Sequence, residues 1–175
     1  MDSLFELLKT RRSIRNYLPI AVEKEKINQI TQAALMAPAS KRSNPWEFIV
    51  VENKPTLLKL SECRPHGSQM LVDAPLGIVI IADKTKSDVW MEDASIAAII
   101  MQLQAQDLGL GSCWIQVYGR ENTEGKTAEQ YILELLNIPD HYSVLCILSI
   151  GYPNEERKPF EIEKLAIDKI HFEIF

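Results

Sequence analysis

Apolar residues recur at helical spacing in several separate segments of the chain. The clearest is Val22–Ala37, where they fall on one face until Pro38 ends the pattern. Near the start, Ser3 can cap a helix, because Glu6 follows at the spacing of a capping box. The predicted helices are the segment that Ser3 caps, Val22–Ala37, Pro55–Cys63, Met91–Gly109 and Glu124–Ile138.

Other segments have the apolar and β-branched composition of strands. Leu76–Asp83 is a continuous apolar run, as expected of a central strand buried on both faces. The predicted strands are Trp46–Glu52, Leu76–Asp83, Gly111–Gly119 and Tyr142–Pro153. No repeat and no Gly- or Ser-rich linker divides the sequence. We therefore predict one domain over residues 1–175, of α/β or α+β class, with an apolar sheet between helices.

Two segments have more apolar surface than one small domain can cover. The predicted helix Met91–Gly109 is apolar around most of its circumference, so a second subunit is a candidate to bury part of it. The chain ends in "IHFEIF", where Ile170, Phe172, Ile174 and Phe175 would meet water in a monomer. We expect the tail, residues 160–175, to pack on the partner subunit of a homodimer; the alternative is a tail folded back on its own subunit.

Composition narrows the partners. The net charge of −5 argues against nucleic acid, whose phosphates select basic surfaces. No apolar run approaches the roughly 20 residues of a membrane span, and the charge order of the first residues is wrong for a signal peptide. The sparse cysteines Cys63, Cys113 and Cys146 have no CxxC spacing and suit a reducing compartment. We expect a cytoplasmic protein.

Motifs for other chemistries fail on spacing or context. "GLGSCW" contains Gly109 and Gly111, but Trp114 stands where a dinucleotide fingerprint needs its third glycine. The segment also follows a predicted helix, whereas that fingerprint follows a strand. The three histidines are isolated, so no metal site is predicted, and no nucleophile elbow supports a Ser-His-Asp triad.

"KTRRSIRNY", Lys9 to Tyr17, concentrates cations in an otherwise acidic chain. Arg11, Arg12 and Arg15 surround Ser13. One interpretation is that the first two arginines complement the negative end of the first helix. The other is an anion site, because guanidinium groups match the geometry of phosphate and other planar anions. Composition alone does not decide between them.

Five segments, in order, resemble the nitroreductase family. "RRSIRNY" resembles its opening FMN-binding motif, and "APASKRSNPWEFIVVE" its A-P-S-x-x-N-x-Q-P-W-x-F segment. "WMEDASIAAIIMQLQAQDLGLGSCWI" resembles its long central helix and following strand, and "LSIGYPNEERKP" its late G-Y-P loop. "EKLAIDKIHFEIF" resembles the C-terminal extension of short members. The resemblance implies an α+β homodimer, with a mostly antiparallel sheet flanked by helices and two FMN sites at the subunit interface.

The same resemblance implies roles for individual residues. Arg11 and Ser13 would hold the phosphate or ribityl chain, with Arg12 nearby, and Arg15 would reach the N1–O2 edge of the flavin. The partner subunit would contribute the 38–40 segment. Lys158 would be a late phosphate partner, with Arg157 as its rival. The implied cofactor-binding residues are Arg11, Arg12, Ser13, Arg15, Pro38, Ala39, Ser40, Asn44, Gln116, Val117 and Lys158.

Three residues depart from the family pattern. Arg42 stands where Asn is usual, Asn44 where Gln is usual, and Ala39 replaces a common Ser. Arg42 adds a charge at the mouth of the inferred site, so substrate preference does not carry over directly.

The implied activity is FMN-dependent hydride transfer by a ping-pong route, from NADH or NADPH to a nitroaromatic, a quinone or a similar acceptor. FMN would carry the redox chemistry, and a cation at its N1–O2 edge would stabilise negative charge on the reduced ring. No catalytic acid, base or nucleophile of the protein is expected. The alternatives are a flavin carrier or sensor of the same fold with little turnover, and a module that binds a different phosphorylated metabolite.

Overall fold

A computed structural model describes residues 3–122 and 125–175 of the chain. Its core is a sheet of β1 (Trp46–Val51), β2 (Leu76–Asp83), β3 (Gly111–Gln116) and β4 (Tyr142–Gly151). The strand order is β1-β2-β4-β3, and every neighbouring pair is antiparallel. The prediction of an α+β fold with an antiparallel sheet is confirmed.

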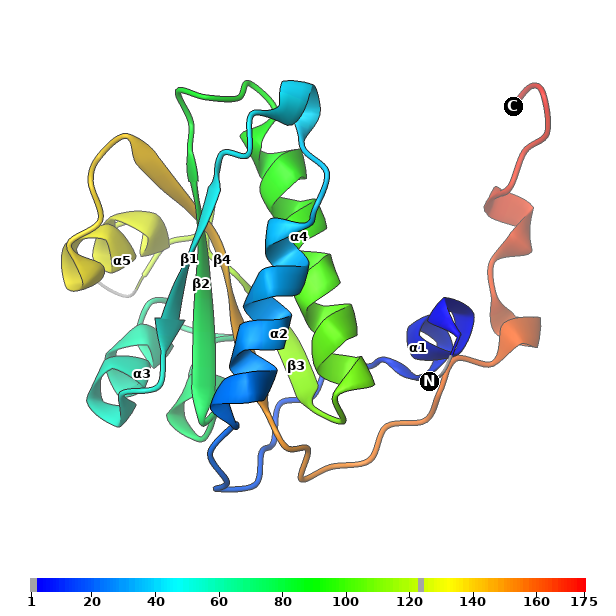
Figure 1. Ribbon diagram of the computed structural model, residues 1–175, viewed down its shortest axis with the longest axis horizontal. Helices are drawn as coiled ribbons and strands as arrows, with labels where there is room; N and C mark the ends of the chain where they lie inside the picture. The colour runs from blue at the N-terminus through cyan, green and yellow to red at the C-terminus, as the bar shows by residue number, and fades with distance from the viewer. Residues whose placement is uncertain (1–2, 123–124) are drawn as a thin grey trace.

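Helices cover both faces of the sheet (Figure 1). On one face lie α2 (Lys24–Leu35) and α4 (Trp90–Asp107), and on the other lie α3 (Lys54–Ser61) and α5 (Ala128–Leu136). The central strand β2 alternates between the two layers: Ile78 and Ile80 pack with the α2–α4 core, and Val79 and Ile81 with the α3–α5 core. This explains why its sequence is apolar throughout.

Most predicted elements end within two residues of the observed bounds, and two differ by more at one end. The strand predicted over Gly111–Gly119 ends at Gln116, because the N–H groups of Val117 and Tyr118 both donate to the Leu145 carbonyl and break the ladder. The helix predicted over Glu124–Ile138 begins at Ala128, where Thr127 and Gln130 form a capping box. Glu124 lies outside the described residues.

The helix α4 divides its residues between two surroundings. Its buried side includes the small residues Ala94, Ala97 and Ala98, which allow close packing on the sheet. Met91, Ile96 and Ile99 are exposed. Within the part of the chain described, no helix is both long and apolar enough to cross a membrane.

The first and last segments of the chain lie together, away from the sheet (Figure 1). The short helix α1 (Leu4–Thr10) is joined to the tail where the Phe160 N–H donates to the Lys9 carbonyl at 2.9 Å. Beyond this contact the tail stands apart from the body, with 3-10 turns at Ile162–Lys164 and Ile167–Lys169. Phe172 and Phe175 are 85% and 104% exposed, so this chain alone does not bury its terminus.

Candidate functional site

The arginine segment runs along the outer edge of β3. Ser13 forms a parallel bridge with Ser112, and the Ile14 N–H donates to the Ser112 carbonyl at 3.0 Å. Ile14 packs so closely on Gly111 that a Cβ there would lie 2.7 Å from the Ile14 Cβ. Gly111 is therefore required for this approach. At the end of the segment, the buried Tyr17 hydroxyl donates to the Ile14 carbonyl and also bonds the Ser149 hydroxyl.

The carboxylate of Glu155 fixes the backbone of this segment. Its Oε1 accepts from the N–H groups of Arg15 and Asn16 at 2.5 and 3.1 Å, and its Oε2 pairs with Arg157 at 2.5 Å. Burial opposes its ionisation, but these N–H groups and the Arg157 guanidinium outweigh burial and lower the Glu155 pKa. This residue holds the arginine segment and the 154–158 loop together.

These contacts build a hollow of about 290 Å³ lined by cations. Its lining residues are Arg11, Arg12, Ser13, Arg15, Arg157 and Phe160. Within residues 3–122 and 125–175, Arg157 is the one guanidinium of this group in an ion pair. Arg11, Arg12 and Arg15 thus bring positive charge to the hollow that no described carboxylate pairs with. A bound anion would balance it.

The arginines of the hollow differ in their contacts. Arg12 donates to the Lys158 carbonyl, and its guanidinium lies 4.7 Å from the centre of the Phe160 ring. Arg12 therefore also ties α1 and the tail together. Arg11 is the C-cap residue of α1, so the dipole interpretation keeps its geometric basis. Between the two rival late cations, Arg157 lines the hollow and the Lys158 side chain does not.

A second hollow, of about 410 Å³, borders Arg15. Asn16, Gly67, Gln69, Met70 and Asp73 complete its lining. Sequence reasoning assigned no role to residues 64–73, because they carry no motif. Their place beside Arg15 depends on the fold, in which Arg64 donates to the Gln116 carbonyl at 2.9 Å.

The segment 38–44 lies away from the arginine hollow, against the first turn of α4. Since α4 spans 18 residues, its length of roughly 27 Å separates this segment from the start of β3, where Ser13 bridges Ser112. Figure 1 shows the turn Ser40–Arg42 at the opposite end of α4 from α1. The structure therefore does not bring Pro38, Ala39, Ser40 and Asn44 together with the arginines within one chain.

The shape of this segment is unusual. Lys41, Arg42 and Asn44 have positive φ angles of 53°, 57° and 42°. For residues other than glycine, the left-handed region costs roughly 1–2 kcal/mol each, somewhat less for Asn. Asp93, which is 3% exposed, holds the segment: its Oδ1 accepts from the Ser40 N–H at 2.8 Å, and its Oδ2 from the hydroxyls of Ser87 and Ser43 at 2.8 and 3.5 Å.

Gln116 and Val117, two of the implied cofactor-binding residues, have different surroundings. The half-buried Gln116 is bonded through its side chain to Trp114 Nε1 and the Tyr118 carbonyl. Val117 is buried, and its N–H donates to Leu145. A ligand beside this chain can therefore meet the Gln116 side chain but not the Val117 side chain.

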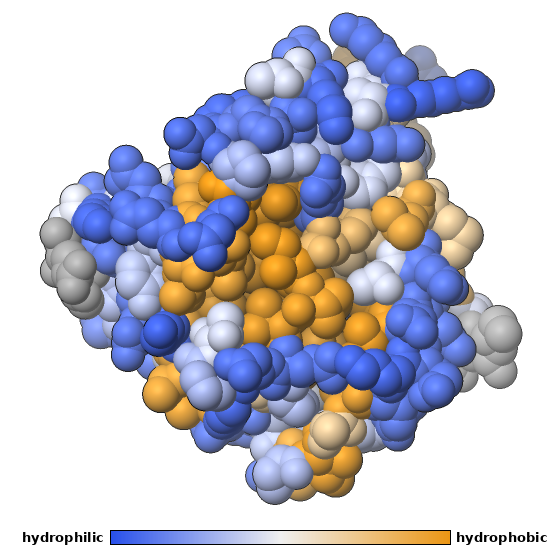
Figure 2. Space-filling model, turned by 60° about the vertical axis from the view of Figure 1, so that its left-hand side comes forward, coloured by the Kyte–Doolittle hydropathy of each residue, from blue (hydrophilic) through white to orange (hydrophobic). Residues whose placement is uncertain are grey.

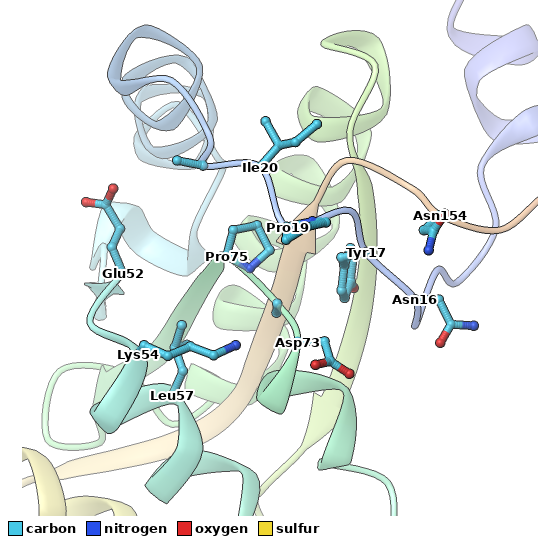
Figure 3. A pocket seen from close by; sticks show the side chains of 12 residues that line it. Asn16, Tyr17, Pro19, Ile20, Glu52, Lys54, Leu57, Asp73, Pro75 and Asn154 are labelled. Atoms are coloured by element: carbon cyan, nitrogen blue, oxygen red, sulfur yellow. The ribbon is translucent and has the colours of Figure 1, made fainter.

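Another hollow, of about 790 Å³, lies near the arginine segment but has different chemistry (Figure 3). Figure 3 shows Tyr17, Pro19 and Pro75 along it, with Asp73 and Lys54 below them. Its lining mixes acids, one lysine and apolar residues, and contains none of the arginines. It therefore lacks the cluster of guanidinium groups that lines the 290 Å³ hollow.

All three cysteines are free and buried. Burial raises the pKa of the Cys63 thiol to about 11 and also raises the pKa values of Cys113 and Cys146. Protonated, buried thiols are poor nucleophiles, so these residues serve as small apolar side chains of the core.

The chain belongs to the nitroreductase family, whose model matches residues 8–64 and 52–152. A solved FMN-dependent nitroreductase from Clostridium difficile R20291 shares 55% identity and superimposes with a TM-score of 0.96, covering 98% of this chain and 99% of that one. A protein of Archaeoglobus fulgidus, provisionally named an NADH dehydrogenase/NAD(P)H nitroreductase, is 38% identical over 99% of both chains. An FMN reductase [NAD(P)H] of Bacillus subtilis is 29% identical over 91% of this chain and 70% of its own length.

Proposed function

We propose that this protein is an FMN-dependent oxidoreductase that takes electrons from NADH or NADPH. The observation that carries this is the hollow in which Arg11, Arg12 and Arg15 converge without a described carboxylate partner. A phosphate monoester supplies the negative charge and the acceptor oxygens that such a site requires. The likeness to an FMN-dependent nitroreductase over almost the whole of both chains supports FMN as the ligand.

Four residues of the hollow then have a task. Arg11 and Ser13 bind the phosphate end, and Arg157, rather than Lys158, is the late cation that the lining favours. Arg15, which borders both this hollow and the 410 Å³ hollow, extends toward the flavin ring and places a positive charge at its N1–O2 edge. Bound FMN would supply two-electron chemistry, and a fixed cation at that edge favours the reduced state.

The functional unit we propose is a homodimer in which each flavin meets both subunits. The arginine hollow and the 38–44 segment lie apart within one chain, so a second chain is needed to bring such segments together. Exposed apolar surface supports this. The tail exposes Phe172, Ile174 and Phe175, which would pack on the partner.

The body of the protein also offers a receiving surface. Among the described strands, β1 pairs with β2 alone, and its outer edge is open. Val50 of β1 and Leu58 of α3 are exposed. Figure 2 shows a broad apolar surface framed by polar side chains where the α3–α5 side comes forward. The open edge presents backbone groups with which another chain can pair, and the apolar surface beside it can bury the side chains of an extended apolar tail.

For the reaction, we propose two half-reactions. NADH or NADPH first reduces the bound flavin, and the reduced flavin then passes two electrons to a small organic acceptor of the nitroaromatic or quinone type. The buried, free cysteines agree with a reducing cytoplasm as the working compartment. Arg42 is exposed in the segment predicted to face the substrate, so acceptors that carry negative charge are favoured over cationic ones.

A direct test uses the colour of the purified protein. We expect a yellow preparation whose visible absorbance is bleached by NADH or NADPH without oxygen and returns when an acceptor is added. Bound FMN without oxidation of either nicotinamide would instead indicate a flavin carrier or sensor. A colourless protein that ignores added FMN but binds another phosphate ester would overturn the proposal.

A further inference from the structure

Asp93 is a buried acid next to the 38–44 segment, and its hydrogen-bond partners come from that segment and from the loop before α4. Asp93 is almost fully buried, and none of the ion pairs within the described parts of the chain includes it. Its partners are neutral donors: one backbone N–H and two hydroxyls. Burial of a carboxylate is unfavourable, and the first turn of α4 offsets this only in part.

Two of these donors stand on either side of the strained turn. Ser40 precedes Lys41 and Arg42, and Ser43 follows them, so the same carboxylate holds both flanks. Left-handed conformations at residues other than glycine persist when the surroundings determine them. The third donor, Ser87, fixes the carboxylate itself from the loop before α4.

We propose that Asp93 is a positioning residue, whose buried carboxylate holds the segment Ser40–Asn44 in the one shape that can meet the flavin. The inference rests on the flavin site proposed above, in which this segment faces the ring across the subunit interface. Asp93 itself does not touch the flavin. It acts through Ser40 and Ser43, and so sets where the charges of Lys41 and Arg42 are displayed.

The first arm of the test needs no flavin. Trypsin cleaves after lysine and arginine, and Lys41 and Arg42 are exposed, so the cleavage rate at this turn reports how firmly it is held. In Asp93→Ala we expect cleavage there to accelerate roughly tenfold or more at a temperature where the fold is intact. Asp93→Asn should stay near the unaltered protein, because its amide oxygen can accept from Ser40 and its NH₂ group can donate to Ser87.

Glu92→Ala is the matched control, since Glu92 is an exposed acid of the same first turn. It removes the same charge from the helix terminus but no contact to the turn, and its cleavage rate should not change. If Asp93→Ala does not fold, Ser87→Ala, which removes one partner of the carboxylate, takes its place. Equal cleavage in all variants, or faster cleavage at every site in the chain, would overturn the positioning role.

The second arm uses the flavin-loaded protein. Asp93→Ala should weaken FMN binding about tenfold and shift the visible absorption maximum of the bound flavin, and Asp93→Asn should restore both. If the unaltered protein binds no FMN, the proposed function fails while the cleavage result still decides the role of Asp93 in the turn. If it binds FMN and Asp93→Ala binds it with equal affinity and an unchanged spectrum, positioning toward the flavin is wrong.

Discussion

The two ends of α4 each border a segment that an acid holds in place, but the two acids work differently. Asp93 at the first turn is buried among neutral donors and holds a turn within its own layer. Glu155, beside the strand that follows α4, reaches a segment 140 positions earlier and shares its charge with Arg157. At the first end, the acid is satisfied by donors of its own layer. At the second, Arg11, Arg12 and Arg15 gather around one hollow without a described carboxylate partner, so this is the end at which we expect a phosphate.

The largest expected effect comes from preventing dimer formation, so that the 38–44 segment of one subunit no longer meets the arginine hollow of the other. Removal of all residues after Leu165 deletes the exposed apolar tail, and we expect it to yield a monomer without bound FMN. Sedimentation and visible absorbance measure both consequences on one sample, because cofactor that binds only the dimer stabilises it by mass action.

Glu173→Ala in the full chain is the control, since it changes the tail without removing its apolar residues. A full-length monomer that still binds FMN tightly would contradict the proposed dimer. It would also show that the arginine end of α4 suffices alone.

The next largest effect separates two arginines within the ligand-binding end. Arg11→Ala should lower FMN affinity roughly 10- to 150-fold, which corresponds to the loss of about 1.5–3 kcal/mol for a charge-assisted contact. Arg15→Ala should affect binding less, but should lower the reduction potential of the flavin and slow its reduction. Fluorescence titration and a potentiometric titration measure the two properties.

Lys158→Ala is a useful control, because the Lys158 side chain does not line the hollow. Equal effects of Arg11→Ala and Arg15→Ala on both properties would show that the assigned roles along the segment are wrong.

A smaller effect tests how the arginine segment is held. Glu155→Ala leaves the N–H groups of Arg15 and Asn16 without their acceptor, and should lower the free energy of unfolding by about 1–2 kcal/mol, since solvent partly screens the site. Chemical denaturation measures it. Glu156→Ala, an exposed neighbour, should be neutral. Equal losses of unfolding free energy in the two variants would show that Glu155 does not hold the arginine segment.

The smallest effect is the pH dependence of the same contact. The pKa of Glu155 is lowered in the folded protein, so its stabilisation is fully present above its ordinary pKa of 4.5 and is lost as the pH falls through the folded value. The difference in unfolding free energy between the unaltered protein and Glu155→Gln should be constant from pH 7 to about pH 6 and shrink below pH 4.5. A difference in unfolding free energy that grows on acidification would show that folding does not lower the Glu155 pKa.

Local pattern predicted most of the secondary structure. Leu76–Asp83 is the strand β2 with the predicted bounds, because a continuous apolar run requires burial on both faces. The strand from Gly111 was predicted too long because its end depends on the Leu145 carbonyl, which no local pattern reveals. That bound failed because a partner far along the chain decided it, whereas the start of α5 is set by the local capping box of Thr127 and Gln130, a signal that the prediction passed over.

The candidate site, too, could be predicted from the sequence only in part. The arginine segment could be predicted because its residues are contiguous. Asp93 and Glu155 could not, since Asp93 acts on Ser40, 53 positions away, and Glu155 acts on Arg15. In the sequence, Glu155 and its neighbour Glu156 look equivalent. The nearest available signal was that Glu155 lies in a stretch of mixed charge after Gly151 and Pro153, which is too weak to choose between them.

The pairing of Arg15 with Glu155 and of Arg12 with Lys158 also sets an order on biosynthesis. These partners are 140 and 146 positions apart, so the arginine segment leaves the ribosome long before the residues that hold it. Until residues 155–160 have been translated, the hollow lacks Arg157 and Phe160, and the N–H groups of Arg15 and Asn16 lack their carboxylate acceptor. A phosphate ligand that needs the whole hollow can therefore bind only after this distant segment has been made.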